Sequence, residues 1–306
     1  MPENIKVPLN VDATNKSLFI NNYSNLTHGS GNLFLVAGDQ RVEHLITSFL
    51  GEGISPDDLN PEHYFKIAKN SNIGAFSTQV GYLTTYGMDY KEVPYIVKLN
   101  SISKVTKEGY GYSFSRKWVD VAKIKELKEK NNLNILGIGY TLYMGIKNES
   151  KMLAETSKVI NKSHSLGFPV VLWIYPKGNA VKNETDPILV KTAANIGGAL
   201  GADFIKINAP DEFDTNMANL GDAVVAAGRS KVIVAGGKYV DPEEYLQTTD
   251  LQLKNAKTYG VAVGRNIHQK SYIDAVKFCN AIYSLVVEKK ELSTILKEYK
   301  SIQSIV

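Results

Sequence analysis

Short apolar runs alternate with longer segments of mixed polarity along most of the chain. From residue 31 onward, eight of these runs have the length of a buried strand, and most segments between them carry apolar residues at helical spacing. The strands are expected to begin at Gly31, Ile73, Tyr95, Asn134, Pro169, Asp203, Lys231 and Gly260. The helices are expected over residues 14–26, 61–70, 117–130, 150–166, 186–200, 211–227, 242–257, 269–288 and 292–305. The pattern is weakest from Gly81 to Arg116, where a polar stretch beginning at Ser101 predicts a long loop or hairpin.

Eight strands with helices between them are typical of a (β/α)8 barrel. A doubly wound sheet would normally have fewer strands or be divided by a linker, and the chain has no linker rich in Pro, Gly and Ser. We therefore expect one α/β domain, a single TIM barrel. Residues 1–30 are expected to form an N-terminal extension, residues 31–288 the barrel, and residues 289–306 a C-terminal helical segment.

The composition is that of an ordinary globular protein, with 306 residues of which 43% are hydrophobic and 22% charged. A net charge of +4 gives no electrostatic case for nucleic-acid binding and is compatible with a small anionic substrate. No apolar run approaches the roughly 20 residues that span a bilayer, and the N-terminus lacks the apolar core of a secretory signal. We expect a cytoplasmic protein without membrane contact. The single cysteine, Cys279, excludes an intramolecular disulfide and a cysteine-rich metal site.

The sixth expected strand, GADFIKINAP (201–210), carries a lysine at its centre. Lys206 shares one face of this strand with Phe204, and apolar residues flank it on both faces, as in a parallel sheet covered on both sides. Burial lowers the pKa of a lysine, and a neutral amine can attack a carbonyl group to form a Schiff base. The strand alone leaves two interpretations open, a nucleophile or a structural lysine paired with a carboxylate.

The fifth expected strand, VVLWIYPKG (170–178), places three polar or aromatic side chains on one face, those of Trp173, Tyr175 and Lys177. Tyr175 lies at the carboxyl end of the strand, close enough to the neighbouring strand to reach the amine of Lys206, and a phenol there can move protons. Trp173 alone is more easily explained as filling of the barrel. Lys177 is open to two interpretations, a substrate contact or a solvated charge.

Three further loops follow strand ends, where barrel enzymes hold their chemistry. Asp39 follows the first strand and can hold a substrate hydroxyl or the ammonium of Lys206, or can cap the next segment. His44 lies in the same loop and contacts either the substrate or other residues of the loop. The seventh and eighth strands end in a glycine pair and in a glycine followed by arginine. Glycine amides and a guanidinium suit a phosphate, so phosphate binding is expected at Gly236, Gly237, Gly264 and Arg265.

A metal-dependent mechanism is disfavoured by the placement of the five histidines. Only His44 and His268 fall near expected strand ends, whereas a catalytic zinc site usually has three protein ligands. We expect neither a metal nor a cofactor.

Five segments resemble the archaeal-type class I fructose-bisphosphate aldolases, the DhnA family. They are VAGDQRVEH (36–44), VVLWIYPKG (170–178), GADFIKINAP (201–210), VIVAGG (232–237) and GVAVGRN (260–266), in family order. The resemblance implies a barrel in which Lys206 forms a Schiff base with dihydroxyacetone phosphate, Tyr175 transfers protons beside Trp173, and Asp39 lies after the first strand. It also implies that the late loops bind phosphate, and that the protein forms a homo-oligomer, often a decamer in the family.

The chain departs from the family pattern at two positions. Arg41 stands where the family has glycine, and Lys177 stands where it commonly has arginine, which keeps the charge but loses the bidentate fork. Both changes are expected at the rim that receives the second substrate. We therefore expect reversible cleavage of fructose 1,6-bisphosphate to dihydroxyacetone phosphate and glyceraldehyde 3-phosphate. Two alternatives stay open, a related Schiff-base aldolase or transferase for another ketose phosphate, and a phosphate-binding barrel without lyase activity.

Overall fold

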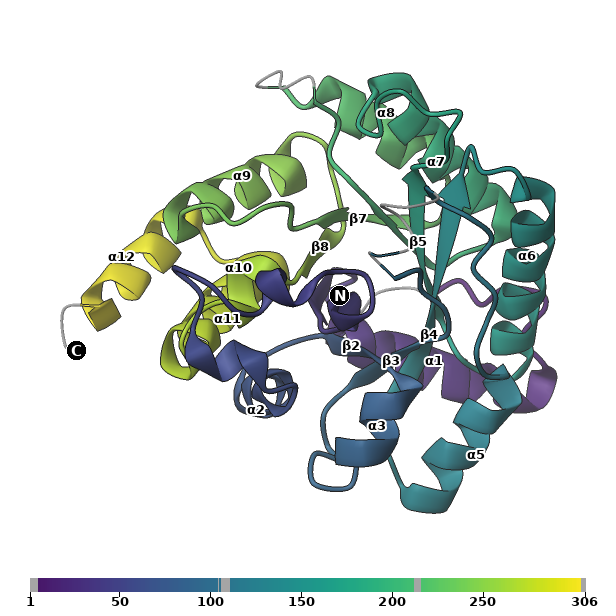
Figure 1. The fold of residues 1–306 in the computed structure, drawn as a ribbon, viewed down its shortest axis with the longest axis horizontal. Coiled ribbons are helices and arrows are strands. Elements are labelled where there is room, and N and C mark those ends of the chain that lie inside the picture. The colour runs from purple at the N-terminus through teal and green to yellow at the C-terminus, as the bar shows by residue number, and fades with distance from the viewer. Residues whose placement is uncertain (1–4, 104, 106–110, 212–215, 304–306) are drawn as a thin grey trace.

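Eight parallel strands close into a barrel in the order of the chain, with β8 returning to β1 (Figure 1). The computed structural model describes residues 5–103, 105, 111–211 and 216–303. The strands are β1 (Leu33–Ala37), β2 (Ala75–Gln79), β3 (Tyr95–Lys98), β4 (Ile135–Met144), β5 (Val170–Pro176), β6 (Phe204–Ile207), β7 (Lys231–Ala235) and β8 (Gly260–Val263). Each begins within two residues of its expected position, so the predicted TIM barrel is confirmed.

Nearly every strand residue is buried, because the inner faces pack on one another and the outer faces are covered by helices. The parity expected for the sixth strand holds. Ile205 faces the surrounding helix α7, where a side chain at Gly197 would collide with it. Phe204 faces the interior, where its ring stacks on Tyr23 with the ring centroids 5.1 Å apart. The alternate residue Lys206 therefore also faces the interior of the barrel.

The helices surround the barrel. They are α1 (Lys16–Thr27), α2 (Glu62–Asn70), α3 (Val80–Tyr86), α5 (Val121–Asn131), α6 (Glu149–Ser165), α7 (Pro187–Leu200), α8 (Ala218–Ala226), α9 (Pro242–Lys254), α10 (Arg265–His268), α11 (Tyr272–Val286) and α12 (Leu292–Gln303). All except α3 and α10, which were not expected, overlap the expected ranges; α8 begins at Ala218 instead of residue 211. Part of the expected helix 211–227 (residues 212–215), part of the expected loop 101–116 (residues 104 and 106–110) and both chain ends lie outside the described residues.

Local signals explain where several helices begin. Asp186 and Asp241 each precede a proline, and each carboxylate accepts hydrogen bonds from the backbone N–H groups of the second and third residues of the helix that follows. Helix α3 is absent from the helices expected above, because its sequence VGYLTTY is rich in residues with low helix propensity. Thr84 and Thr85 donate their hydroxyls to carbonyl groups one turn earlier within α3.

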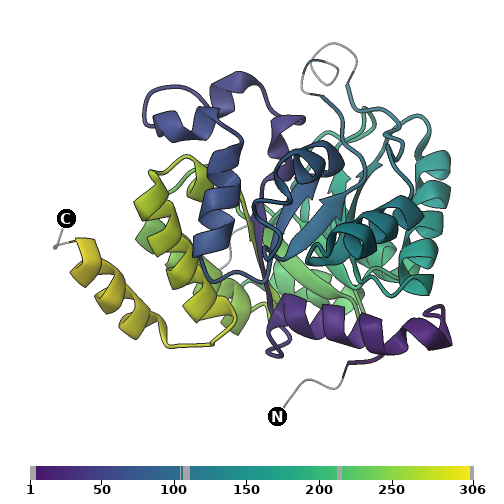
Figure 2. The same ribbon diagram turned by 90° about the horizontal axis from the view of Figure 1, so that it is seen from below.

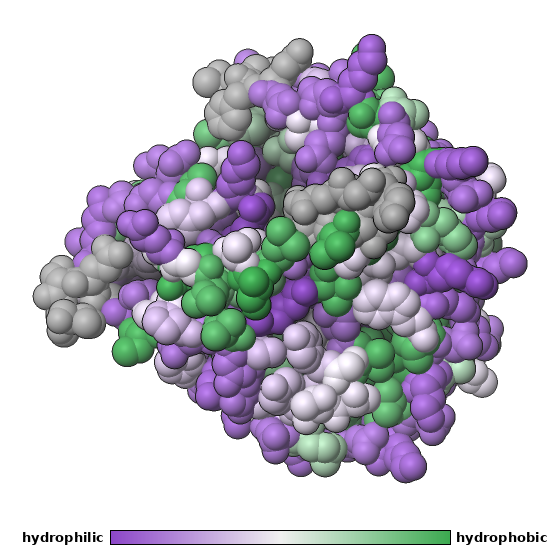
Figure 3. All heavy atoms as spheres, viewed as in Figure 1, coloured by the Kyte–Doolittle hydropathy of each residue, from purple (hydrophilic) through white to green (hydrophobic). Residues whose placement is uncertain are grey.

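The two ends of the barrel differ. At the amino-terminal end of the strands α1 lies across the barrel and contributes Phe19, Tyr23 and Leu26 to the core (Figure 2). The opposite end carries the longer loops, among them residues 38–61 with the short 3-10 turns η2 (Asp39–Arg41), η3 (Ile46–Ser48) and η4 (Pro56–Leu59). On the face shown in Figure 3, hydrophobic side chains border a polar hollow. None of the described helices is long and apolar enough to cross a membrane.

Candidate active site

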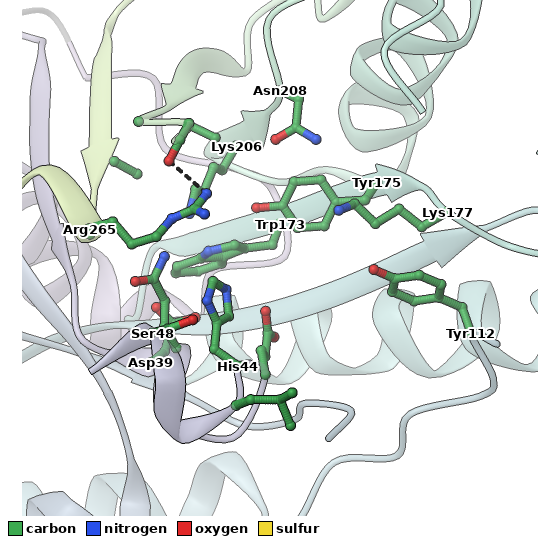
Figure 4. Close-up of a pocket in the computed structure, with 18 of the residues that line it drawn as sticks. Asp39, His44, Ser48, Tyr112, Trp173, Tyr175, Lys177, Lys206, Asn208 and Arg265 are labelled. Atoms are coloured by element: carbon green, nitrogen blue, oxygen red, sulfur yellow. Dashed lines mark hydrogen bonds between the residues drawn. The ribbon is translucent and has the colours of Figure 1, made fainter. Parts of the chain in front are cut away.

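A cavity of about 350 Å³ lies at the carboxyl ends of the strands. Strands β1, β5, β6, β7 and β8, or the loops that follow them, all contribute to its wall (Figure 4). All ten residues predicted for the site line it, namely Asp39, His44, Trp173, Tyr175, Lys177, Lys206, Gly236, Gly237, Gly264 and Arg265. The barrel therefore brings together side chains that are up to 226 positions apart in the sequence, from Asp39 to Arg265. Their individual roles stay predictions.

Lys206 is the buried amine of this cavity, with only 5% of its surface exposed. Burial, helped by the nearby ammonium of Lys98 and opposed by Asp39, lowers the pKa of Lys206 to about 8. At neutral pH a larger share of this amine is consequently neutral than in an exposed lysine. This is the state that attacks a carbonyl group.

Asp39 is held by a second buried lysine, Lys98 on β3, which the sequence analysis did not single out. The Lys98 ammonium donates to Asp39 Oδ2 at 2.6 Å, and the Ser77 hydroxyl donates to Oδ1 at 2.9 Å. Burial alone would raise the pKa of Asp39, but the charges of Lys98 and Lys206 outweigh it and hold the pKa below its usual range. The ammonium that Asp39 binds directly is thus that of Lys98. The Asp39 side chain does not cap the 3-10 turn η2 that begins with it.

Trp173 does more than fill the barrel, because its ring lies between the two lysines. The Lys98 Nζ atom is 4.4 Å and the Lys206 Nζ atom 5.4 Å from the ring centroid. Gly139 on β4 leaves room for this arrangement, since a Cβ atom there would lie 2.8 Å from the Trp173 ring and 3.2 Å from Lys98. In Figure 4, Asp39, His44 and Ser48 lie on one side of Trp173, and Lys206 and Asn208 lie on the other.

Tyr175 holds its phenolic proton firmly. Burial raises its pKa well above the usual value, and the negative charges of Glu43, Asp39 and Glu184 raise it further. The phenol is therefore neutral at physiological pH and enters any reaction as a proton donor. The expected acid-base role of Tyr175 begins with this donation.

Lys177 lies at the edge of the cavity and is paired. Its ammonium is 2.6 Å from Glu184 Oε2 and lies over the rings of Tyr175 and Tyr112, with Nζ 5.3 Å and 5.8 Å from the ring centroids. Figure 4 shows Tyr112 beside it. Lys177 is thus partly shielded from solvent and has Glu184 as its counterion. This pairing reduces the attraction of Lys177 for a second phosphate group of a substrate.

The loops after β7 and β8 are tied to each other. Arg265 donates from Nη2 to the Gly237 carbonyl at 2.7 Å, and Asn266 donates to the carbonyls of Gly236 and Lys238. The Gly236 amide donates to the Ala262 carbonyl, so this predicted phosphate ligand already has a partner. Gly237 has a φ of 68°, a conformation that favours glycine. The arginine and the open backbone at Gly237 remain suited to an anion.

Arg41 does not face the cavity, contrary to the expectation for this departure from the family. Its guanidinium lies 4.5 Å from the Phe49 ring centroid and 5.2 Å from that of Tyr64, and it donates to the backbone carbonyls of Leu59 and Asp58. The aromatic rings hold the arginine beneath the loop after β1. His44 does line the cavity, with its ring centroid 6.4 Å from that of Phe49.

The described residues contain no group of three or more His, Cys, Asp or Glu side chains placed to hold a metal ion. Of the two histidines expected near strand ends, His268 is 1% exposed and its Nδ1 atom lies 2.7 Å from Asp58 Oδ2. It lies behind the wall of the cavity.

Comparison with known proteins gives a consistent assignment. The family model for DeoC/LacD family aldolases matches residues 33–270. A fructose-bisphosphate aldolase/6-deoxy-5-ketofructose 1-phosphate synthase of Methanocaldococcus jannaschii is 45% identical over 96% of this chain and 94% of that protein. The solved structure of a fructose-bisphosphate aldolase from Slackia heliotrinireducens superposes with a TM-score of 0.93 at 38% identity, covering 97% of this chain and 94% of that one.

A second solved structure is an archaeal fructose-1,6-bisphosphate aldolase in which the catalytic lysine is covalently bound to the carbinolamine intermediate of the substrate. It superposes with a TM-score of 0.75 at 29% identity and covers 88% of this chain and 99% of that one. The resemblance to archaeal-type class I fructose-bisphosphate aldolases is therefore confirmed. The chain belongs to the DeoC/LacD family of aldolases.

Proposed function

We propose that this protein is a class I fructose-bisphosphate aldolase whose Schiff base forms on Lys206. The observation that carries the proposal is the buried amine of Lys206, with its pKa lowered to about 8, in a cavity that also holds Tyr175 and Asp39. A structural lysine would be paired, and Asp39 pairs instead with Lys98. The names of the relatives at 38% and 45% identity agree with this activity.

The reaction begins when neutral Lys206 attacks the C2 ketone and gives a carbinolamine. Tyr175 donates its proton to the departing hydroxyl, which leaves as water, and the C2–N bond becomes an iminium ion beside a phenolate. The positive charge of the iminium stabilises the phenolate. This attraction outweighs the burial and the nearby carboxylates that otherwise hold the pKa of Tyr175 high.

The phenolate then takes the proton of the C4 hydroxyl. The C3–C4 bond breaks, its electron pair moves toward the iminium nitrogen, and an aldehyde and an enamine result. Tyr175 returns this proton to C3 of the enamine and becomes a phenolate again. Water then adds to the iminium, the excess proton returns to the Tyr175 phenolate, and dihydroxyacetone phosphate and the neutral amine of Lys206 are released. Asp39, kept ionised by Lys98, accepts hydrogen bonds from substrate hydroxyls. The electron sink is organic, so these steps need no metal or other cofactor.

The phosphate of the dihydroxyacetone half is assigned to the loops after β7 and β8. Arg265 supplies charge there, and the open space beside Gly237, which has no side chain, lets an anion approach the backbone. Binding of this phosphate, remote from the reacting carbons, positions C2 over Lys206.

A second candidate is synthesis or cleavage of a ketose 1-phosphate without a 6-phosphate. It is favoured by the double name of the Methanocaldococcus jannaschii relative and by the pairing of Lys177 with Glu184, which leaves the acceptor side without an unpaired cation at this position. Aldol cleavage of 6-deoxy-5-ketofructose 1-phosphate between C3 and C4 would give dihydroxyacetone phosphate and a three-carbon dicarbonyl compound. Both reactions use the same Schiff base.

Product analysis separates the candidates. Purified protein is given fructose 1,6-bisphosphate, and in parallel dihydroxyacetone phosphate with either glyceraldehyde 3-phosphate or a three-carbon dicarbonyl acceptor. The leading proposal expects cleavage of the bisphosphate that disappears in Lys206→Met. A negligible rate with the bisphosphate beside efficient use of the dicarbonyl acceptor would replace it with the second candidate. The homo-oligomer and the cytoplasmic location expected from the sequence stay predictions.

A further inference from the structure

A chain of three polar side chains runs from the protein interior to the cavity wall beside the assigned phosphate loops. Asp58 Oδ2 lies 2.7 Å from His268 Nδ1, and His268 Nε2 lies 3.1 Å from the side-chain amide of Gln40. Asp58 is fully buried and His268 is 1% exposed. Gln40 lines the cavity, and its amide lies next to Gly264, where an added Cβ atom would be within 2.6 Å of both amide heteroatoms.

The number of protons on Asp58 and His268 determines which end of the Gln40 amide faces the cavity. The pair has two states to compare, a neutral His268 ring opposite a carboxylate of Asp58, and the same pair with one additional proton. With the additional proton, His268 Nε2 carries a hydrogen and donates it to the Gln40 carbonyl oxygen. The amide NH2 group then points away from His268. When that proton is lost, the ring hydrogen belongs on Nδ1 opposite the carboxylate. Nε2 must then accept from the NH2 group, and the carbonyl oxygen points away.

The contacts of Asp58 favour the state that holds the proton. Among the described residues no side chain or amide donates a hydrogen bond to Asp58 Oδ1, and the Arg41 guanidinium, 3.7 Å away, is too far to do so. A carbonyl oxygen of a neutral acid tolerates this better than a buried carboxylate does. Burial raises the pKa of Asp58 to about 7, against the lowering effect of Arg41. Burial and the charges of Arg41, His63 and Arg265 lower the pKa of His268 well below its usual value, which favours the proton on Asp58.

Four titratable or charged side chains face this pair from the elements around it. They are Arg41 of η2, His63 and Tyr64 of α2, and Arg265 of α10. His63 Nε2 contacts the carbonyls of His268 and Lys270 at 3.0 Å and 3.2 Å, so it carries a hydrogen and accepts nothing from the pair. Burial raises the pKa of the Tyr64 phenol well above its usual value. Asp58 is therefore a group of this cluster that burial brings to titrate near neutral pH.

We propose that the proton held by Asp58 and His268 turns the NH2 group of Gln40 toward the anion subsite beside Gly264 and Arg265, which makes Gln40 a ligand of the substrate phosphate. Loss of the proton reverses the amide and presents its carbonyl oxygen to the anion. Gln40 then repels the group that it held before. This proposal rests on the proposed function only in that the phosphate is assigned to these loops.

Sulfate binding tests the proposal without any aldol chemistry. Sulfate keeps a charge of −2 over the whole range from pH 5.5 to 8.5, so its own titration does not interfere, as that of phosphate would. The dissociation constant is measured by calorimetry for the wild type, Asp58→Asn and Gln40→Met. In the wild type it should rise about tenfold or more through neutral pH, since a hydrogen bond to a charged group contributes roughly 1.5 kcal/mol or more.

Asp58→Asn carries no proton to lose. Arg41 lies on the Oδ1 side of residue 58, 3.7 Å away, so the asparagine oxygen should face Arg41 and its NH2 group should donate to His268 Nδ1. This variant should bind sulfate at pH 8 as tightly as at pH 6, apart from the change caused by Lys206. Gln40→Met should bind weakly with the same residual pH dependence. The proposal would be overturned if sulfate binding to Asp58→Asn also weakened tenfold between pH 6 and pH 8. It would equally be overturned if the wild type lost no more affinity over this range than Asp58→Asn does.

The tautomer of His268 gives an independent readout. In protein with 15N-labelled histidine, the His268 signals are identified by their loss in His268→Gln. They should report hydrogen on Nε2 at pH 6 and on Nδ1 at pH 8 in the wild type, and on Nε2 at both values in Asp58→Asn. A tautomer that does not change in the wild type refutes the switch even if the protein proves to be an aldolase. Conversely, a protein that cleaves no ketose phosphate but shows both changes would refute only the proposed function.

Discussion

Replacing Lys98 with methionine should raise the pKa of Lys206. Lys98 lowers the pKa of Lys206 directly by its charge, and it also occupies Asp39 through a contact of 2.6 Å. Without Lys98, the Lys206 ammonium loses a repulsive neighbour, and Lys206 and Asp39 become each other's remaining close counterions. Both changes stabilise the charged amine.

The size of the effect follows from the two limiting pKa values. A lysine with a pKa of about 8 is roughly 9% neutral at pH 7. The neutral fraction of a lysine at the ordinary pKa of 10.5 is about 300-fold smaller. Lys98→Met should raise the pKa of Lys206 part of the way from about 8 toward 10.5. Each unit of this rise should reduce Schiff-base formation at pH 7 by about tenfold. The change also removes the cation that hydrogen-bonds directly to the buried Asp39 carboxylate, so a loss of stability of about 3–5 kcal/mol is expected.

The pKa can be measured without turnover by competitive acetylation of Lys206 between pH 6 and 11, with the extent of labelling read by mass spectrometry. Lys98→Arg keeps the charge and serves as the matched control, with an apparent pKa near that of the wild type. Circular dichroism confirms that each variant is folded before labelling. An apparent pKa in Lys98→Met equal to or below the wild-type value would refute the reasoning.

Three further changes test other parts of the site. Gly139→Ala places a methyl group 2.8 Å from the Trp173 ring and should reduce stability by about 1–3 kcal/mol in urea unfolding, whereas Gly81→Ala, with open space around it, should not. Tyr175→Phe should lower kcat by about 10²–10⁴-fold while the protein still binds substrate, which single-turnover kinetics would show; an unchanged kcat would remove the tyrosine from the mechanism. Lys177→Met should raise KM for fructose 1,6-bisphosphate and leave KM for an acceptor without phosphate unchanged, and an equal rise for both would argue against a role at the second phosphate.

The strands and most helices could be predicted because each carries its own signal. Buried parallel strands give continuous apolar runs, and Asp-Pro pairs mark the beginnings of α7 and α9. Helix α3 carries no such signal, since its glycine, threonines and tyrosines have low helix propensity, and the surrounding structure overrides that propensity. Local pattern therefore predicts an element only where propensity and tertiary packing agree.

The site could be predicted in part because barrel topology brings strand ends together. Lys98 could have been found by the reasoning applied to Lys206, as a lysine within the apolar run YIVK of β3. The contact of Asp58 with His268 could not, because it joins residues 210 positions apart that no motif connects. The burial of Arg41 was equally hidden, since it depends on the rings of Phe49 and Tyr64.

The most direct test of the account is reductive trapping of the Schiff base. The protein is treated with borohydride in the presence of dihydroxyacetone phosphate, and peptides are analysed by mass spectrometry. A Schiff base on Lys206 should give a reduced triose phosphate adduct on that residue, loss of activity in proportion to labelling, and no adduct in Lys206→Ala. No labelling of the wild type, or labelling that persists in Lys206→Ala, would contradict it.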